Sequence, residues 1–340
     1  MGKGSRDSSR VASVQREQAP QAQAMIRIEH WDEPAVRLGE CSARANSADS
    51  HSSQLSVCMS SLSLKPAAEW VMDIPDSSRD VLSPASSSAG WQRCTMERTY
   101  SKSWTRAHTG FKVYASGTSL GSEATPILQA SKRPPKDGGG YWISALPGPD
   151  VRHTHCATLK WNLLRTEFRL QSRWCECCDP GTNVFSAEAT TSGCRQDLAA
   201  FIYERNWRGD APRRLAAALP PMDRRHPHRA AVLCPMQGHP PLAHSLRDNQ
   251  VRLQQLLHLT SLQPAWNQAI QRHEMSFSSR VTVPSVHNFQ LVAAQQQSHK
   301  LLEFGKTGKG LYVLDYRYPM SLAQATACAL SSFEASSLCT

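Results

Sequence analysis

With 340 residues, of which 40% are apolar, the chain can build a substantial core in one large domain with a tail or in two ordinary domains. Its formal net charge of +10 argues against a cationic partner and favours an anionic one, such as nucleic acid, a phosphoinositide-bearing membrane or an acidic protein. The N-terminus lacks the apolar segment of a secretory signal, so the eleven cysteines indicate a reduced intracellular setting.

The first 78 residues are predicted to form a disordered tail, because they are rich in Ser, Ala, Gln and Arg. The segment 24–38 could form a short helix or strand, although Pro34 interrupts it. A folded domain is then expected over residues 79–340. The tail would be available for protein partners.

Short β-rich runs recur from about residue 90, and several alternate apolar and polar residues as half-buried strands do. Turns rich in Gly and Pro separate them, which predicts an antiparallel sandwich or barrel. Two helices are predicted, at 194–206 and at 246–259. The predicted strands are 111–116, 140–146, 166–172, 280–286, 288–294, 300–305 and 311–318.

A further helix is predicted near the end of the chain, where residues 320–330 are apolar or small on every side of a helical wheel. The run is shorter than the roughly 20 apolar residues that a membrane span needs. A helix that is apolar all round is buried all round, and a wide barrel has a lumen that must be filled. The sequence therefore predicts that this helix passes through the barrel.

The stretch "LLEFGKTGKGLYVLDYRYPMSLAQATACALSSFEASSLC" (301–339) resembles the C-terminal signature of tubby-like proteins. The resemblance continues upstream, in the same order, through "RQDLAAFIYERN" (195–206) and "PAWNQAIQRHEMSFSSRVTVPSVHNFQLV" (264–292), and it covers about residues 80–340. It implies a mainly β fold with a buried α-helix: a closed antiparallel β-barrel of about twelve strands around a C-terminal hydrophobic helix.

The same resemblance implies a non-enzymatic, monomeric adaptor that binds phosphatidylinositol 4,5-bisphosphate at the cytoplasmic face of a membrane, without a cofactor. Such adaptors act in membrane-protein trafficking, in some members to cilia, or in the nucleus after release. The family's Lys/Arg pair on the first hairpin falls on Lys132 and Arg133, and its "RSN" motif on Lys160, Trp161 and Asn162. The implied phosphoinositide-binding residues are therefore Lys132, Arg133, Lys160 and Asn162.

Departures from the family pattern could weaken both binding and stability. Lys160 stands where the family has Arg, which keeps the charge but loses bidentate geometry, and Pro134 and Pro135 replace basic residues of the hairpin. Met320, Thr326 and Cys328 stand where bulkier or differently shaped residues often occur in the closing helix. Each loss of bulk in a core costs about 2 to 5 kcal/mol unless its neighbours compensate.

Other interpretations of the basic residues, and other functions for the protein, remain open. The hairpin cations could be ordinary solvated side chains. The segment 205–229 carries seven arginines and could bind nucleic acid or extend an anionic-lipid footprint. A ubiquitin-ligase-type interaction adaptor is a further alternative, because plant members of the family often carry an F-box before the barrel. Residues 64–90 are, however, too short and Pro-rich for that helical unit.

No metal site and no catalytic residue are expected. "HTHC" (153–156) and "WCECC" (174–178) are dense in ligand types, but neither supplies Cys-x2-Cys repeated at a distance, as structural zinc sites do. The glycines of 305–310 do not follow the phosphate-loop order and are typical of a hairpin turn. Neither His-Glu-x-x-His nor Gly-x-Ser-x-Gly occurs.

Overall fold

The computed structural model describes most of the chain beyond residue 77, together with one short segment before it. The described residues are 25–29, 78–100, 108–118, 124–145, 154–178, 193–206, 212–226, 228–248, 256–269 and 271–336. The segment 24–38 was expected to form either a short helix or a strand. It supplies strand β1 (Met25–Glu29), which pairs in parallel with β12 (Arg272–Ser278). The remainder of the predicted tail, apart from Ser78, lies outside the described residues.

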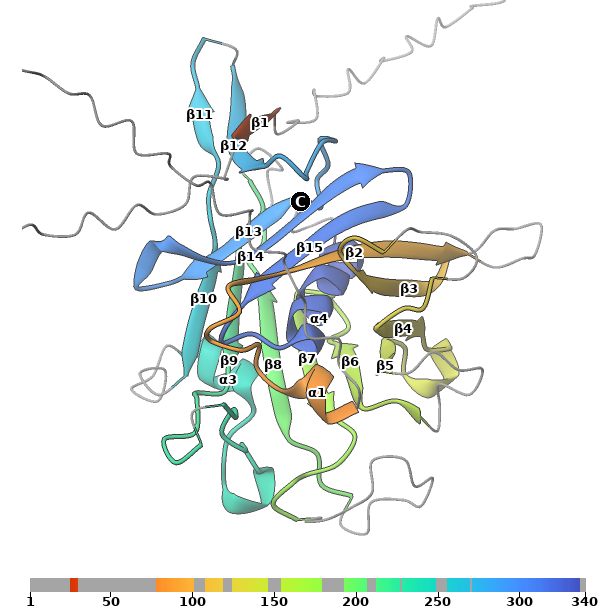
Figure 1. Ribbon diagram of the computed structural model, residues 1–340. Helices are drawn as coiled ribbons and strands as arrows, with labels where there is room; N and C mark the ends of the chain where they lie inside the picture. Colours follow the sequence, from red (N-terminus) through yellow and green to blue (C-terminus); the bar gives the residue numbers. More distant parts are fainter. Residues whose placement is uncertain are drawn as a thin grey trace, which may run out of the picture.

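Twelve strands form a closed barrel in which every neighbouring pair is antiparallel, as the sequence predicts. Figure 1 shows how the first and last barrel strands in the sequence, β2 and β15, lie side by side. In order around the barrel they are β10 (Leu257–Ser261), β13 (Phe289–Ala293), β14 (Gln296–Gly308), β15 (Leu311–Arg317), β2 (Trp91–Tyr100), β3 (His108–Ala115), β4 (Leu128–Lys132), β5 (Tyr141–Ser144), β6 (Ala157–Trp161), β7 (Glu167–Ser172), β8 (Asp197–Tyr203) and β9 (Leu215–Leu219).

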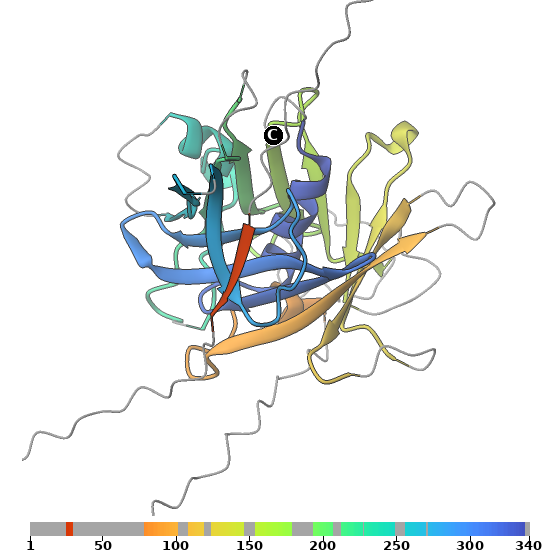
Figure 2. The ribbon, with the colours of Figure 1, turned by 90° about the horizontal axis from the view of Figure 1, so that it is seen from above.

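The barrel encloses helix α4 (Leu322–Glu334), and both ribbon views show the helix among the strands (Figures 1 and 2). Ser321 begins the helix with a capping box, in which its hydroxyl accepts from the Gln324 N–H and Gln324 Oε1 accepts from the Ser321 N–H. Every residue of α4 except Phe333 is buried, which confirms that the helix fills the lumen. Full burial of a side chain such as Leu330 contributes about 1.5 to 3 kcal/mol.

The predicted helix at 194–206 is wrong, because residues 197–203 form strand β8 between β7 and β9. Helix α3 (Leu242–Arg247) covers one face of β8, where Ala200 packs against Leu242 and Ala243. On the other face, Gln324 of α4 donates to the Leu198 carbonyl at 2.9 Å. A strand buried on both faces loses its alternation of polar and apolar residues, and so it resembles a buried helix in sequence.

Two further predictions need correction. The predicted helix at 246–259 is wrong, since α3 ends at Arg247, residues 249–255 lie outside the described part and β10 begins at Leu257. The predicted strand at 280–286 is reduced to an isolated bridge between Val283 and Lys306. Pro284 cannot donate to a ladder, and Val281 packs so closely on β14 that a Cβ at Gly305 would lie 2.3 Å from its Cγ1.

A smaller three-stranded sheet lies beside the barrel and is ordered β1, β12 and β11 (Ala265–Asn267). Phe277 and Met275 of β12 pack with Val281 and with Val313 of the barrel strand β15. The remaining short elements are helix α1 (Ser78–Leu82) and the 3-10 turns η1 (Pro135–Asp137) and η2 (Pro235–Gln237). Among the described residues, no helix is long and apolar enough to cross a bilayer.

Candidate functional site: a basic face on strands β4 to β8

Lys132, the last residue of β4, points to the inside of the barrel. Its register partner on β5 is Tyr141, a core residue, and its Nζ lies 3.0 Å from Oε1 of Glu334 at the end of α4. The Tyr141 hydroxyl donates to the same carboxylate oxygen at 2.7 Å, and Arg165 Nη1 lies 3.5 Å from Oε2. Lys132 therefore neutralises a buried carboxylate and holds the end of α4.

Arg133 follows Lys132 in the chain but lies on the outer face. Its guanidinium lies 5.5 Å from the ring centre of Trp142, whose neighbours Tyr141 and Ile143 face the core. Arg133 Nη2 donates to the Asp137 carbonyl of the η1 turn. Nε and Nη1 are buried and have no hydrogen-bond partner among the described residues. Burial lowers the pKa of Arg133, and the positive charge of Arg195 lowers it further against the opposing effect of Asp137.

Lys160 lies on the same outer face, on β6. Its neighbours in the strand, Leu159 and Trp161, pack against the core, and alternation turns Lys160 outward. Burial lowers the pKa of Lys160, and the charges of Arg195, Arg133 and Arg169 add to this effect. A lysine crowded by like charges gains most from an anion, because an anion removes both the repulsion and part of the desolvation cost.

Arg173 and Arg195 complete this group. Arg173 follows β7, and its pKa is lowered by burial and by the charge of Arg195, which stands just before β8. We call Arg133, Lys160, Arg173 and Arg195 the basic face. Guanidinium groups offer paired donors that match phosphate oxygens, and an ammonium adds a compact point charge. The basic face is therefore suited to bind a phosphate ester.

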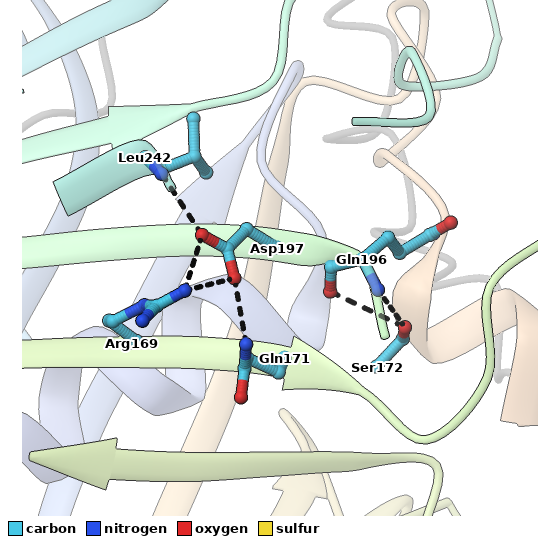
Figure 3. Close-up of polar contacts among 6 residues, drawn as sticks. All are labelled: Arg169, Gln171, Ser172, Gln196, Asp197 and Leu242. Carbon is cyan, nitrogen blue, oxygen red and sulfur yellow. Dashed lines mark hydrogen bonds and ion pairs between the residues drawn. The ribbon is translucent and has the colours of Figure 1, made fainter. Parts of the chain in front are cut away.

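Arg169 borders the basic face, but its charge is already balanced. Its Nη2 lies 3.1 Å and 3.2 Å from the two carboxylate oxygens of the buried Asp197, as Figure 3 shows. Gln171 donates to the same carboxylate at 3.0 Å, and so does the Leu242 N–H at the start of α3. Asp197 thus fixes α3 to the barrel. It also holds Arg169 in place beside Lys160, which is the register partner of Arg169 on β6.

Asn162 has a local role in the loop between β6 and β7. Its Oδ1 accepts from the backbone N–H groups of Thr166 at 2.9 Å and Glu167 at 3.2 Å, and its Nδ2 donates to Thr166 Oγ1 at 3.0 Å. Both ends of the amide are therefore engaged within the loop. Asn162 shapes the connection that follows Lys160.

The sequence profile of the Tub family matches residues 81–335, which includes the whole barrel and α4. The chain belongs to the Tub family. Among its relatives, Tubby protein homolog 1 of Caenorhabditis elegans is 32% identical over 219 residues, which cover 63% of this chain and 49% of the relative. Tubby-related protein 3 of Homo sapiens is 29% identical over 308 residues, covering 89% and 67% respectively. Tubby-related protein 1 of Mus musculus is 36% identical over 217 residues, covering 63% and 38%. The chain thus spans about half to two thirds of the length of the first two relatives.

Membership of the Tub family confirms the resemblance noted in the sequence and the prediction of a non-enzymatic protein. The resemblance implies four phosphoinositide-binding residues. This tubby barrel brings two of them, Arg133 and Lys160, together on its outer face, whereas Lys132 faces the inside of the barrel. Arg173 and Arg195 were not recognised from the sequence. Arg195 lies inside the segment 194–206 that was predicted to be a helix, and only the pairing of β8 with β7 places it near Lys160.

The arginines of 205–229 take up separate positions on the tubby barrel. Arg213 donates to the Ser332 carbonyl at 2.8 Å and lies over the Tyr203 ring, and Arg214 lies 3.7 Å from Glu204. Arg224, Arg225 and Arg229 are exposed, and Arg208 lies outside the described residues. Of the segment 64–90, which was considered for an F-box, residues 64–77 are also outside them.

Proposed function

We propose that the basic face binds the phosphorylated head group of phosphatidylinositol 4,5-bisphosphate and so holds the protein at the cytoplasmic face of a membrane. The protein then acts as a monomeric, non-enzymatic adaptor in membrane-protein trafficking, including traffic to cilia. Tubby domains are phosphoinositide-binding domains, and membership of that family supports the proposal. The net charge of +10 supports it as well.

One observation carries the proposal: two guanidinium nitrogens of Arg133, Nε and Nη1, are buried without a partner among the described residues, beside a lysine crowded by like charge. Buried donors are normally satisfied, and an unsatisfied one costs about 1 to 3 kcal/mol. A ring phosphate between Arg133 and Lys160 would accept from these donors and balance the repulsion at Lys160. The Trp142 ring, which lies against the Arg133 guanidinium, would keep that side chain extended over the outer face.

The remaining predicted binding residues have supporting roles in this proposal. Lys132 and Asn162 are engaged with Glu334 and with the loop after β6, so they position the strands that carry Arg133 and Lys160. Arg173 and Arg195 add charge at the edge of the site, where each cation near an anionic surface contributes about 1 kcal/mol.

Vesicle sedimentation tests the proposal. The full chain should sediment with phosphatidylcholine vesicles that contain phosphatidylinositol 4,5-bisphosphate in preference to vesicles that carry the same total charge as phosphatidylserine. Loss of one charge-assisted hydrogen bond costs about 1.5 to 3 kcal/mol, so Arg133→Ala should weaken binding by about tenfold or more. Lys160→Ala should weaken it in the same direction.

The matched control is Lys309→Ala, which removes an exposed cation in the turn between β14 and β15. This variant should keep the preference for the bisphosphorylated lipid. Equal sedimentation with both vesicle types would contradict the proposal, and so would a preference that survives in the Arg133→Ala, Lys160→Ala double variant. Binding to duplex DNA that falls steeply with salt and depends on Arg224 and Arg225 would instead favour a nucleic-acid role.

A further inference from the structure

Four cysteine side chains meet at the end of the barrel where β7 leaves and β8 enters. Cys175 and Cys178 lie in the turn after β7, Cys194 lies just before β8, and Cys234 precedes η2 in the connection from β9 to α3. The four Sγ atoms all lie within 4.8 Å of one another. Three separate parts of the chain thus deliver their sulfur atoms to one point.

The distances fit coordination to a common ion. Cys178 Sγ lies 3.5 Å from Cys234 Sγ, and Cys194 Sγ lies 3.8 Å from the same atom. A disulfide would require about 2.05 Å. A zinc ion holds thiolates at about 2.3 Å in a tetrahedron, which places the sulfur atoms about 3.8 Å apart. The observed separations are close to that edge length.

The surroundings of the cluster are those of a closed site. Cys175 and Cys234 have no exposed surface, and Cys194 is 8% exposed. The only other hydrophobic side chain that packs with this group, among the described residues, is Val232. The cluster therefore contains almost no hydrocarbon, and burial of apolar surface gives little reason for these residues to gather.

The backbone presents the sulfur atoms in tight turns. Cys175 and Cys178 have the Cys-x2-Cys spacing, and the Cys178 N–H donates to the Cys175 carbonyl at 3.2 Å. At Cys234 the Gln237 N–H donates to the Cys234 carbonyl at 3.1 Å, and Gly238 closes the turn with φ 77°. Glycine adopts this left-handed conformation at little cost. Cys177 is exposed and is not one of these four residues; its sulfur accepts from the Gln237 side-chain amide at 2.9 Å.

We propose that Cys175, Cys178, Cys194 and Cys234 bind one Zn²⁺ as a structural tetrathiolate site. Four thiolates in a tetrahedral arrangement select zinc among the common divalent ions, and four protein ligands leave no position open for a substrate. The ion ties the β7–β8 connection to the segment after β9, which has little regular structure of its own. This inference goes beyond lipid binding and does not depend on it.

The sequence alone favours the absence of a metal site, because only two of the four cysteines form a recognisable Cys-x2-Cys pair. Cys194 and Cys234 are far apart in the chain, and neither belongs to a Cys-x2-Cys pair. Only the fold brings them to Cys175 and Cys178. His155, which is the described histidine of 153–156, is not part of the group.

Metal analysis of the full chain, purified from a reducing cytosol without chelators, tests the site. About one Zn²⁺ per chain is expected. Replacement by Co²⁺ should give the intense d–d and sulfur-to-metal charge-transfer absorption of a tetrahedral thiolate complex. Cys178→Ser and Cys234→Ser should lose the metal and this absorption, while the matched control Cys177→Ser should keep both.

Removal of the metal should lower the melting temperature of the original chain and of Cys177→Ser, because metal binding contributes to folding. If the Cys→Ser variants fail to fold, the zinc content and the cobalt spectrum of the original chain still show whether the proposed zinc site exists. A chain that is purified free of zinc and gives no thiolate–cobalt absorption would overturn the proposal. Disulfides among these four cysteines in the freshly purified protein would overturn it too.

Discussion

Lys132 Nζ lies 3.0 Å from Glu334 Oε1, which joins the hairpin of β4 and β5 to the last turn of α4. The carboxylate is 6% exposed, and the hydroxyl of the buried Tyr141 donates to the same oxygen at 2.7 Å. This contact explains why one cation of the hairpin faces inward. It also balances the negative end of the helix dipole with a positive charge.

We expect Glu334→Ala to lower the free energy of unfolding by roughly 2 kcal/mol, because it removes the carboxylate that accepts the 2.7 Å hydrogen bond from the buried Tyr141 hydroxyl. Lys132→Ala should cost less than about 1 kcal/mol, since the Lys132 side chain is 39% exposed and water screens its ion pair. Urea unfolding monitored by circular dichroism measures both. Equal losses would show that the ion pair, and not the tyrosine hydrogen bond, dominates.

Lys160→Arg should strengthen binding to vesicles that contain phosphatidylinositol 4,5-bisphosphate. A guanidinium can donate two parallel hydrogen bonds to a phosphate, and an ammonium acts as a point charge. A gain of about 1 kcal/mol corresponds to roughly a fivefold lower dissociation constant. Sedimentation on vesicles of increasing lipid content measures it. Unchanged affinity would mean that Lys160 does not contact the head group.

His287 should make stability depend on pH in mildly acidic solution. Burial lowers the pKa of His287 from 6.5 to about 4, and the charge of Arg213 adds to the effect. Between these values the unfolded chain takes up a proton that the folded chain does not, so stability should fall as pH decreases through this window. The slope should not exceed about 1.4 kcal/mol per pH unit.

The variant His287→Gln isolates this contribution, because its amide can still donate to the Ser332 carbonyl, which lies 3.0 Å from His287 Nδ1. The urea midpoint of the original chain should fall relative to that of the variant as pH decreases from about 7 to about 4. The same pH dependence in both would assign the effect to other groups.

Thr326→Val should stabilise the protein by about 1 kcal/mol. Thr326 is fully buried in α4, and its Oγ1 has no hydrogen-bond partner among the described residues. A methyl group of similar size removes the cost of that hydroxyl. The matched control is Ser331→Ala on the same helix, whose hydroxyl contacts Tyr203 at 2.8 Å and the Cys328 carbonyl at 2.7 Å. Thermal melts should shift in opposite directions, and shifts of the same sign would contradict this account.

Two apolar segments show how much of the fold could be predicted from the sequence. Residues 320–330 were expected to be a buried helix, and α4 does form over Leu322–Glu334, because a helix surrounded by strands needs apolar residues on every side. Residues 197–203 are equally apolar and form a strand, since β8 lies between α3 and the lumen. The periodicity of apolar residues cannot distinguish a buried helix from a strand that is buried on both faces. What distinguishes them is whether the backbone hydrogen-bonds within the segment or to neighbouring strands.

The candidate site was predictable only in part, for a similar reason. Arg133 and Lys160 could be identified from motifs. Whether each side chain lies on the inner or the outer face of the barrel depends on strand register. Arg195 and the cysteine group depend on contacts between segments far apart in the chain. Local spacing carries no information about such contacts.

The position of α4 after the last barrel strand has a consequence for the newly made protein. The ribosome synthesises strands β2 to β15 before the helix around which they close. The barrel cannot close until β15, the last of these strands, pairs with β2. During synthesis the strands therefore expose the apolar lining that Leu322, Leu330 and their neighbours later cover. A premature stop before residue 322 would leave that lining permanently open, and the truncated product should be a substrate for chaperones and proteases.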